Sequence, residues 1–242
     1  MREFHFEIMV EFYFKILPYL TITITYVFFS LLFGFLLGAL TAYFRLSKNR
    51  ILNGIAGAYI TVMRCVPSIV FLFLVYYGLP GLMRDHFGID MNDVDAIVYV
   101  IITFSIMLGA YTSEIMRSAY LSVDHGQFEA AVLVGMDSLT AFRRIIFPQA
   151  LHAAIPNIGN IIIFMFKEGA LAYIIGLQDV LGRGYYLNSL KANAYSMETY
   201  LALTLIYWPL TLILEKTFRV LEKRHSIAFL IQKKSSGKEV QA

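Results

Sequence analysis

The sequence contains an apolar run from Ile16 to Phe44 without a single Asp, Glu, Lys or Arg. A helix needs about 20 mostly apolar residues to cross a hydrocarbon core of about 30 Å, so this run is long enough for one complete span. The whole chain agrees, because 58% of its 242 residues are hydrophobic and 15% are charged, whereas soluble domains carry roughly 25% charged residues. The composition excludes a soluble domain and a disordered chain, and it predicts an all-α membrane protein.

Four further apolar segments follow the first. They are Ala56–Met83, Ala96–Ala119, Ile145–Phe166 and Thr199–Leu214. Lys167, Glu168 and another apolar run follow the fourth segment, so this region is longer and more broken than one simple helix. We therefore expect a polytopic protein with about five transmembrane helices, without an internal repeat or a second soluble domain.

Lysine and arginine are distributed unevenly over the two sides of these spans. Thirteen of the 20 basic residues fall on the side that holds the C-terminal tail, five fall on the other side, and Arg64 and Lys167 lie within the membrane. Because cytoplasmic loops retain positive charge, we expect the N-terminus outside and the C-terminus inside. The residues before Ile16 have no basic cluster ahead of an apolar core, so they do not predict a cleaved signal peptide.

Charged residues within the spans are the first candidates for function. They are Arg64, Glu114, Lys167 and Glu168. Such residues cost about 2.5–3.5 kcal/mol each at the centre of a span on insertion scales, and those that persist tend to be functional. We interpret the four as a substrate path or gate. The alternative is structural pairing, of Glu114 with Arg117 or of Arg64 with Glu114 or Glu168. Gly169 indicates a broken helix beside Lys167 and Glu168, a feature that recurs at transporter substrate sites.

The longest predicted cytoplasmic connection, residues 120–149, has a helical pattern of its own. The triplet Glu129–Ala131 suits the start of a helix, because alanine favours helices and an acid favours the helix N-terminus. Gly135 is placed to end that helix. Asp137, or the serine after it, is placed to cap a second helix that runs into Pro148. We expect two short helices joined by a glycine turn, forming a knob that a partner protein can grip.

These residues resemble the EAA loop of ABC importer permeases. The family pattern is E-A-A, three residues, G, nine residues and I-x-L-P, and this chain has Glu129, Ala130, Ala131, Gly135, Ile145 and Pro148, with Phe147 in place of leucine. Other segments look like the branch that imports polar amino acids, namely Ala110–Ile115, Gly126–Gln127, Phe147–Ala150 and Ile155–Asn157. Two segments near the expected substrate path depart from that branch, Arg-Cys-Val-Pro at 64–67 and Lys-Glu-Gly-Ala-Leu at 167–171.

The resemblance covers about residues 17–221 and implies the type I ABC importer transmembrane fold at residues 16–222. An extracytoplasmic segment at 1–15 would precede it, and a cytoplasmic tail at 223–242 would follow it. The resemblance also implies coupling to a cytoplasmic ABC ATPase dimer through Gly126, Glu129, Ala130, Ala131 and Gly135. Further implied partners are an extracytoplasmic solute-binding protein and a second permease chain, identical or not, in a bacterial cytoplasmic membrane.

The motifs disfavour two other classes of function. The sequence has no G-x-x-x-x-G-K-[ST] loop, so we expect the partner ATPase to bind ATP and this chain to be a transporter subunit without cofactor or enzymatic activity. An intramembrane enzyme is disfavoured because no Ser/His, paired Asp or His-Glu-x-x-His arrangement lies inside a span. A self-powered secondary carrier would carry inverted repeats. The scattered histidines predict no metal site, and no nucleic-acid partner is expected.

The substrate is the least determined of these expectations. The predicted spans hold both positive charge, at Arg64 and Lys167, and negative charge, at Glu114 and Glu168. Mixed charge suits a zwitterion, so we expect a polar or sulfur-containing amino acid such as L-cystine. A cationic amino acid such as arginine is the main alternative.

Overall fold

The computed structural model describes residues 3–91 and 93–239, with the backbone alone at residue 125 and from residue 224 onward. The first part contains α1 (Phe6–Ile16), the 3₁₀ turn η1 (Leu17–Tyr19), α2 (Leu20–Leu46), α3 (Arg50–Cys65), α4 (Ser68–Phe73), the π-helical turn η2 (Leu74–Gly78), α5 (Leu79–Phe87) and α6 (Ala96–Leu121). The second part contains α7 (His125–Leu133), α8 (Ser138–Ala141), the π-helical turn η3 (Phe142–Ile146), α9 (Phe147–Glu168), the 3₁₀ helix η4 (Gly169–Ile175), α10 (Val180–Ser189) and α11 (Ser196–Glu239).

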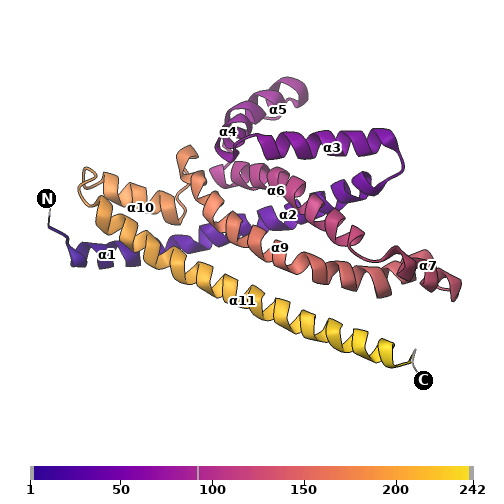
Figure 1. Cartoon of the computed structure of the whole chain (residues 1–242). Helices are drawn as coiled ribbons and strands as arrows, with labels where there is room; N and C mark the ends of the chain where they lie inside the picture. The colour runs from indigo at the N-terminus through magenta and orange to yellow at the C-terminus, as the bar shows by residue number, and fades with distance from the viewer. Residues whose placement is uncertain (1–2, 92, 240–242) are drawn as a thin grey trace.

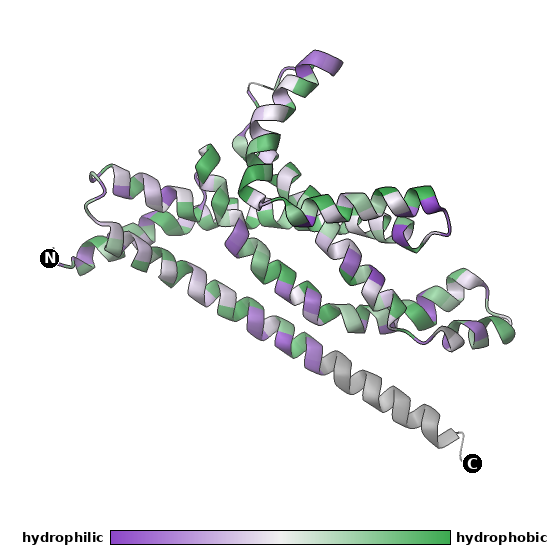
Figure 2. Cartoon of the chain, turned by 45° about the horizontal axis from the view of Figure 1, so that its top comes forward, coloured by the Kyte–Doolittle hydropathy of each residue, from purple (hydrophilic) through white to green (hydrophobic). Residues whose placement is uncertain are grey.

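Five helical stretches in the described part of the chain are long and apolar enough to cross a membrane. They are Phe6–Leu46, Ser68–Phe87, Ala96–Leu121, Ser138–Ile175 and Ser196–Lys223. The prediction of an all-α polytopic protein with about five spans is confirmed. Hydrophilic residues gather at the far end of α5 and at the turn between α2 and α3, and they also recur along α11 (Figure 2).

The centre of the molecule is the contact between α2 and α6, which is the most extensive between any two elements (Figure 1). Gly34 and Gly38 lie one turn apart on α2, and an added Cβ at Gly34 would come within 2.6 Å of the Leu108 Cβ. At Gly38 it would overlap the Thr112 hydroxyl. The Thr112 hydroxyl donates to the Gly34 carbonyl at 3.1 Å. Small residues at this spacing let membrane helices approach closely, so α2 and α6 form a tightly packed pair. On the other side, α9 packs against both α6 and α11.

The first candidate span begins at Phe6, ten residues before the predicted start at Ile16. The charges of α1 do not interrupt it, because Met9, Phe12 and Ile16 are buried at helical spacing while Lys15 pairs with Glu11 at 2.5 Å on the exposed face. The buried face packs with α10 and α11 at one end of the molecule (Figure 1). Residues 6–15 are therefore helical and continue the first span.

The second span was predicted as one helix over Ala56–Met83, and this is wrong. The chain breaks after Cys65: Val66 is extended with ψ 127°, and α4 begins after Pro67. Proline disfavours the helical conformation at the residue before it and lacks the N–H that a continuing helix would use. Arg64 consequently lies in the last turn of α3, outside the candidate span, which begins at Ser68.

The fourth and fifth regions are longer than the predicted segments. The fourth extends over Ser138–Ile175 and changes from α9 to η4 at Gly169, which confirms that it is long and broken. The last helix continues past Leu214, because Glu215 pairs with Arg219 one turn on at 2.5 Å, with both side chains exposed. Its backbone stays helical to Glu239 through the predicted tail, of which residues 240–242 lie outside the described residues.

Candidate functional site

The predicted knob is present, but its first helix starts earlier than expected. The Asp124 carboxylate accepts the Gly126 N–H at 2.8 Å, and α7 begins at His125. The expected start at Glu129 is wrong, because a side-chain oxygen that accepts a free N–H of the first turn is a stronger start signal than an acid followed by alanines. Glu129 therefore lies one turn inside α7, where it and Ala130 are exposed.

The glycine turn has the predicted form. The last residue of α7 is Leu133, and Gly135 has φ +89°, in the left-handed region. The Met136 N–H donates to the Ala131 carbonyl at 3.1 Å, as in a helix end that reverses through a left-handed glycine. Asp137 then caps α8 by accepting the Thr140 N–H at 3.0 Å. Hydrogen bonds from Thr140 also lower the pKa of Asp137 below its usual range.

The knob has one buried and one open apolar face. Ala131 is 3% exposed and packs inward, whereas Leu133, Val134 and Leu139 are 86%, 76% and 64% exposed. We call these three residues the knob tip. These exposed apolar side chains make the knob tip a candidate contact surface for another protein.

The knob is attached to the first turn of α9. The Gln149 amide in α9 donates to the Gln127 side chain in α7 at 2.6 Å and to the Ile145 carbonyl at 2.9 Å. From this end α9 runs to Glu168 at the opposite end of the helix (Figure 1). The knob and the start of this long helix are therefore in direct contact.

At its far end, α9 ends beside the break that separates α3 from α4 at Pro67. Glu168 accepts a hydrogen bond from the hydroxyl of Ser68, the first residue of α4 after the break at Pro67. Lys167 is exposed. The break predicted at Gly169 takes the form of a change from α-helix to 3₁₀ helix, because Gly169 keeps a helical φ of −59° and the helical stretch continues to Ile175. Glycine is required there for space, since an added Cβ would lie 2.6 Å from Cε2 of Tyr26.

Tyr111 of α6 contacts both Arg64, near the end of α3, and Phe164, near the end of α9. The Arg64 guanidinium lies over the Tyr111 ring, 5.9 Å from its centroid, and the Tyr111 and Phe164 rings are 6.4 Å apart. We call Arg64, Ser68, Tyr111, Lys167 and Glu168 the helix-break cluster. Two of the four predicted path residues, Arg64 and Glu168, make side-chain contacts in this group, and Lys167 belongs to it only as the neighbour of Glu168 in the sequence. Ser68 and Tyr111 were missed by the sequence analysis, because a lone serine or tyrosine in an apolar segment gives no signal.

The fourth predicted path residue, Glu114, belongs to an ion-pair cluster. Its carboxylate contacts Arg117 at 2.8 Å, one turn on, and the Nε of Arg45 from α2 at 3.8 Å. Arg64 interacts with it electrostatically and reaches Tyr111 instead of pairing closely. The structure thus contains the Glu114–Arg117 pair that was the structural alternative for this residue.

A buried carboxylate lies near the helix breaks without having been predicted as a site. Asp179 is fully buried and caps α10 by accepting the Gly182 N–H at 2.9 Å, while its second oxygen accepts from the Tyr26 hydroxyl at 3.2 Å. Burial raises the pKa of Asp179 to about 6, and the two hydrogen bonds oppose that rise. Its sequence signal is an acid directly before an apolar helical segment, which is an N-cap pattern.

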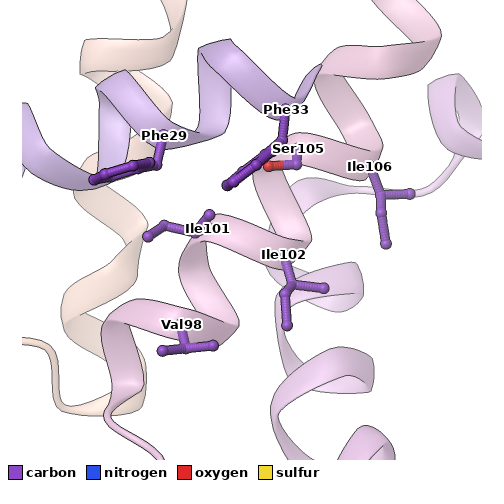
Figure 3. Close-up of a pocket in the computed structure, with 7 residues that line it drawn as sticks. All are labelled: Phe29, Phe33, Val98, Ile101, Ile102, Ser105 and Ile106. Carbon is purple, nitrogen blue, oxygen red and sulfur yellow. The ribbon is translucent and has the colours of Figure 1, made fainter. Parts of the chain in front are cut away.

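An open apolar groove of about 520 Å³ lies between α2 and α6 (Figure 3). It is lined by Phe29, Phe33, Val98, Ile101, Ile102, Ser105 and Ile106. The lining holds no charged side chain, so the groove cannot recognise a zwitterion and is separate from the helix-break cluster. In the described part of the chain, no group of three or more His, Cys, Asp or Glu side chains is arranged to hold a metal ion.

Comparisons with known sequences cover most of the chain. The sequence model of a family described as "Binding-protein-dependent transport system inner membrane component" matches residues 34–227. The L-cystine transport system permease protein TcyL of Bacillus subtilis is 41% identical over 206 residues, 85% of each protein. The histidine/lysine/arginine/ornithine transport system permease protein HisQ of Salmonella typhimurium is 34% identical over 203 residues, 82% of this chain and 87% of HisQ.

Solved structures share the arrangement of helices. A chain in the crystal structure of an amino acid ABC transporter with histidines matches with a TM-score of 0.79 and 31% identity, over 92% of this chain and 100% of that one. A chain of the inward-facing MetNI methionine ABC transporter matches with a TM-score of 0.64 and 17% identity, over 87% and 94% of the two chains. The second likeness concerns the fold alone.

Proposed function

The chain belongs to the family of binding-protein-dependent transport system inner membrane components, and we propose that it is the permease subunit through which an ATP-driven importer moves an amino acid across the membrane. Its fold is that of the type I ABC importer permeases, as the sequence predicted. One observation carries the proposal: α9 joins the exposed knob directly to the helix-break cluster. The same helix thus connects a protein-binding surface with the ionisable residues of a path.

The knob is the proposed contact with a cytoplasmic ABC ATPase dimer. Gly126, Glu129, Ala130 and Ala131 lie in its first helix and Gly135 in its turn, and the knob tip presents the apolar contact. ATP is bound by the partner, and this chain needs no cofactor. Closure of the ATPase would move the knob between two positions, and the bond between Gln149 and Gln127 would carry that movement into α9.

The helix-break cluster is the proposed path for the substrate. Arg64 and Lys167 can attract a carboxylate, and Glu168 can attract an ammonium group, whereas Glu114 is paired with Arg117 and Arg45. Broken helices with ionisable residues at their ends suit transporter substrate sites. The likeness to TcyL supports L-cystine as the first candidate among polar or sulfur-containing amino acids, and the likeness to HisQ supports a cationic amino acid as the alternative.

The remaining parts of the importer follow from the same proposal. Five spans are too few to enclose a path, so a second permease chain, identical or related, completes it. An extracytoplasmic solute-binding protein delivers the amino acid. The basic side of the chain faces the cytoplasm of a bacterial cell, with the N-terminus outside and the C-terminus inside.

Affinity capture tests the coupling. The tagged chain is purified from membranes in mild detergent, and co-purifying proteins are identified by mass spectrometry. We expect an ATPase with a Walker loop to be captured by the wild-type chain and lost with Gly135→Asp, which also abolishes uptake while the chain stays in the membrane. The matched control is Gly88→Asp, because Gly88 also ends a helix with φ +67° but lies at the far end of α5. Retention of ATPase and uptake by Gly135→Asp would contradict the assignment of the knob.

A further inference from the structure

The segment Gly169–Asp179, which we call the strap, is attached at both ends to the same face of α2. At its start, Gly169 packs on the ring of Tyr26, leaving no room for a Cβ. At its end, Asp179 accepts a hydrogen bond from the hydroxyl of that same Tyr26 at 3.2 Å. One tyrosine therefore contacts both ends of an eleven-residue connection.

A second contact from α2 reinforces the far end of the strap. The Thr23 hydroxyl accepts the N–H of Val180 at 3.3 Å, and Thr23, Val180 and Asp179 are all fully buried. Removal of either bond leaves a buried polar group without its partner, which costs more than the bond itself contributes. These contacts thus hold the strap against α2 in the position that the structure shows.

The hydrogen bond from the Tyr26 hydroxyl is the main side-chain contact of the Asp179 carboxylate. From α11, the Tyr207 hydroxyl interacts electrostatically with Asp179, but this buried oxygen has no hydrogen-bond partner among the described residues. On α10, Arg183 is one turn away, and its guanidinium lies over the rings of Tyr19 and Tyr186, 4.8 and 5.0 Å from their centroids. Tyr26 is therefore the side chain that holds the carboxylate.

We propose that the bond between Tyr26 and Asp179 is a latch that holds the strap on α2 and thereby positions Glu168 and Lys167 in the helix-break cluster. Glu168 directly precedes Gly169, so a strap that leaves the Tyr26 ring also shifts Glu168 relative to Ser68. Gly176, with φ +87°, supplies a bend within the strap. Tyr26 and Asp179 are positioning residues, and their role in transport rests on the proposed function.

Thiol labelling measures the latch directly. In a Cys65→Ser background, which removes the one native cysteine, Ala172→Cys places a reporter on the strap at a fully buried position. Ala110→Cys, fully buried on α6, reports general loosening. The full chain in its native membranes is treated with N-ethylmaleimide, and the labelling rate at each reporter is compared with and without Tyr26→Phe.

We expect Tyr26→Phe to raise the labelling rate at position 172 about three- to tenfold, from the loss of one buried hydrogen bond, with no change at position 110. Thr23→Val, which keeps the side-chain shape, should act in the same direction. Tyr99→Phe is the matched control, because Tyr99 is a buried tyrosine of the same core cluster whose hydroxyl bonds to the Met91 carbonyl and not to the strap. An unchanged rate at position 172, or an equal rise at both reporters, overturns the proposal.

A second readout separates the latch from the proposed function. In the assembled importer, Tyr26→Phe should lower the amount of amino acid moved per ATP hydrolysed by about twofold or more, while the ATPase remains bound to the knob. If no ATPase is captured, the proposed function fails, and the labelling comparison still judges the latch. If the ATPase is captured and transport per ATP is unchanged despite faster labelling, the positioning role is overturned.

Discussion

Gln149 in α9 and Gln127 in α7 are joined by a hydrogen bond of 2.6 Å between their side-chain amides. The two residues come from the spanning helix and from the knob, and Gln149 also bonds back to Ile145 within its own helix turn. This pair links the knob to the start of α9, in addition to the packing of α7, α8 and η3. If the knob contacts an ATPase as proposed, such a link limits its rotation relative to α9 and helps it to transmit force.

Loss of the knob-to-helix bond should therefore uncouple the importer. Gln127→Ala removes the acceptor for Gln149, and alanine is at least as favourable as glutamine within α7. We expect uptake to fall about two- to tenfold while ATPase capture is retained. The measurements are uptake into vesicles and affinity capture from the same membranes. Thr204→Ala, which removes an exposed side-chain hydrogen bond within α11, is the control. Wild-type uptake by Gln127→Ala would show that the bond plays no part in coupling.

The turn at Gly135 should tolerate residues according to their ability to adopt positive φ. No atom lies within 4 Å of the position of an added Cβ, so the penalty comes from the backbone alone. Asparagine visits the left-handed region more readily than other residues, whereas a β-branched residue there is strained. We expect ATPase capture to decrease in the order glycine, asparagine, valine. Gly81→Ala, which also adds a Cβ in open space but within the helix α5, should be neutral. Equal capture by Gly135→Asn and Gly135→Val would contradict the backbone explanation.

Hydropathy and short-range patterns predict the spans and the knob, because both depend on residues close in the sequence. The long fourth region and the glycine turn belong to this class. The break before Ser68 was missed because Val66 and Pro67 add to an apolar average even though proline ends a helix. The start of α7 was missed because the prediction was based on the alanine-rich triplet and did not consider the cap at Asp124.

The contacts between distant segments lie beyond such patterns. Ser68 and Glu168 are 100 residues apart, and they meet only because η4 packs beside α4. Gly169 carries an ordinary φ, so its need for glycine arises from the Tyr26 ring and not from its own segment. Asp179 is visible in the sequence as a helix cap, but its burial depends on α2. A sequence pattern identified the ionisable residues that we propose for the path, and only packing reveals their partners.

The aromatic face of Tyr111 should matter more than its hydroxyl. The Arg64 guanidinium lies over the ring, and a cation over an aromatic face gains about 0.5–1 kcal/mol or more. Tyr111→Phe keeps the ring and should leave the KM of uptake within about twofold of wild type. Tyr111→Leu removes the ring and should raise KM about two- to fivefold. The two KM values are measured in vesicles with the same amino acid. A larger effect of the phenylalanine than of the leucine would assign the contact to the hydroxyl.

The close contact between α2 and α6 should make Gly38 sensitive to substitution. Gly38→Ala forces a methyl group against the Thr112 hydroxyl, and overpacking of this kind costs about 1–3 kcal/mol. We expect a lower apparent Tm in detergent. Gly54→Ala is the matched control, because its added Cβ meets no atom within 4 Å and alanine favours the helix α3. An unchanged Tm for Gly38→Ala would show that the two helices separate easily at this level.

The buried carboxylate of Asp179 should make stability depend on pH in an unusual direction. Its pKa is raised by burial to about 6 in the folded chain, whereas an unfolded Asp titrates at about 3.9. The folded state therefore binds the Asp179 proton more tightly than the unfolded state does. The stabilisation of the folded state by this proton is fully present below about pH 4 and is lost as the pH rises through about 6. The difference corresponds to about 2–3 kcal/mol at most.

Asp179→Asn keeps an oxygen for the Gly182 N–H and removes the charge. We expect the apparent Tm of the asparagine variant relative to wild type to increase between pH 5 and pH 8. A constant difference in Tm across this range would mean that Asp179 does not titrate in it.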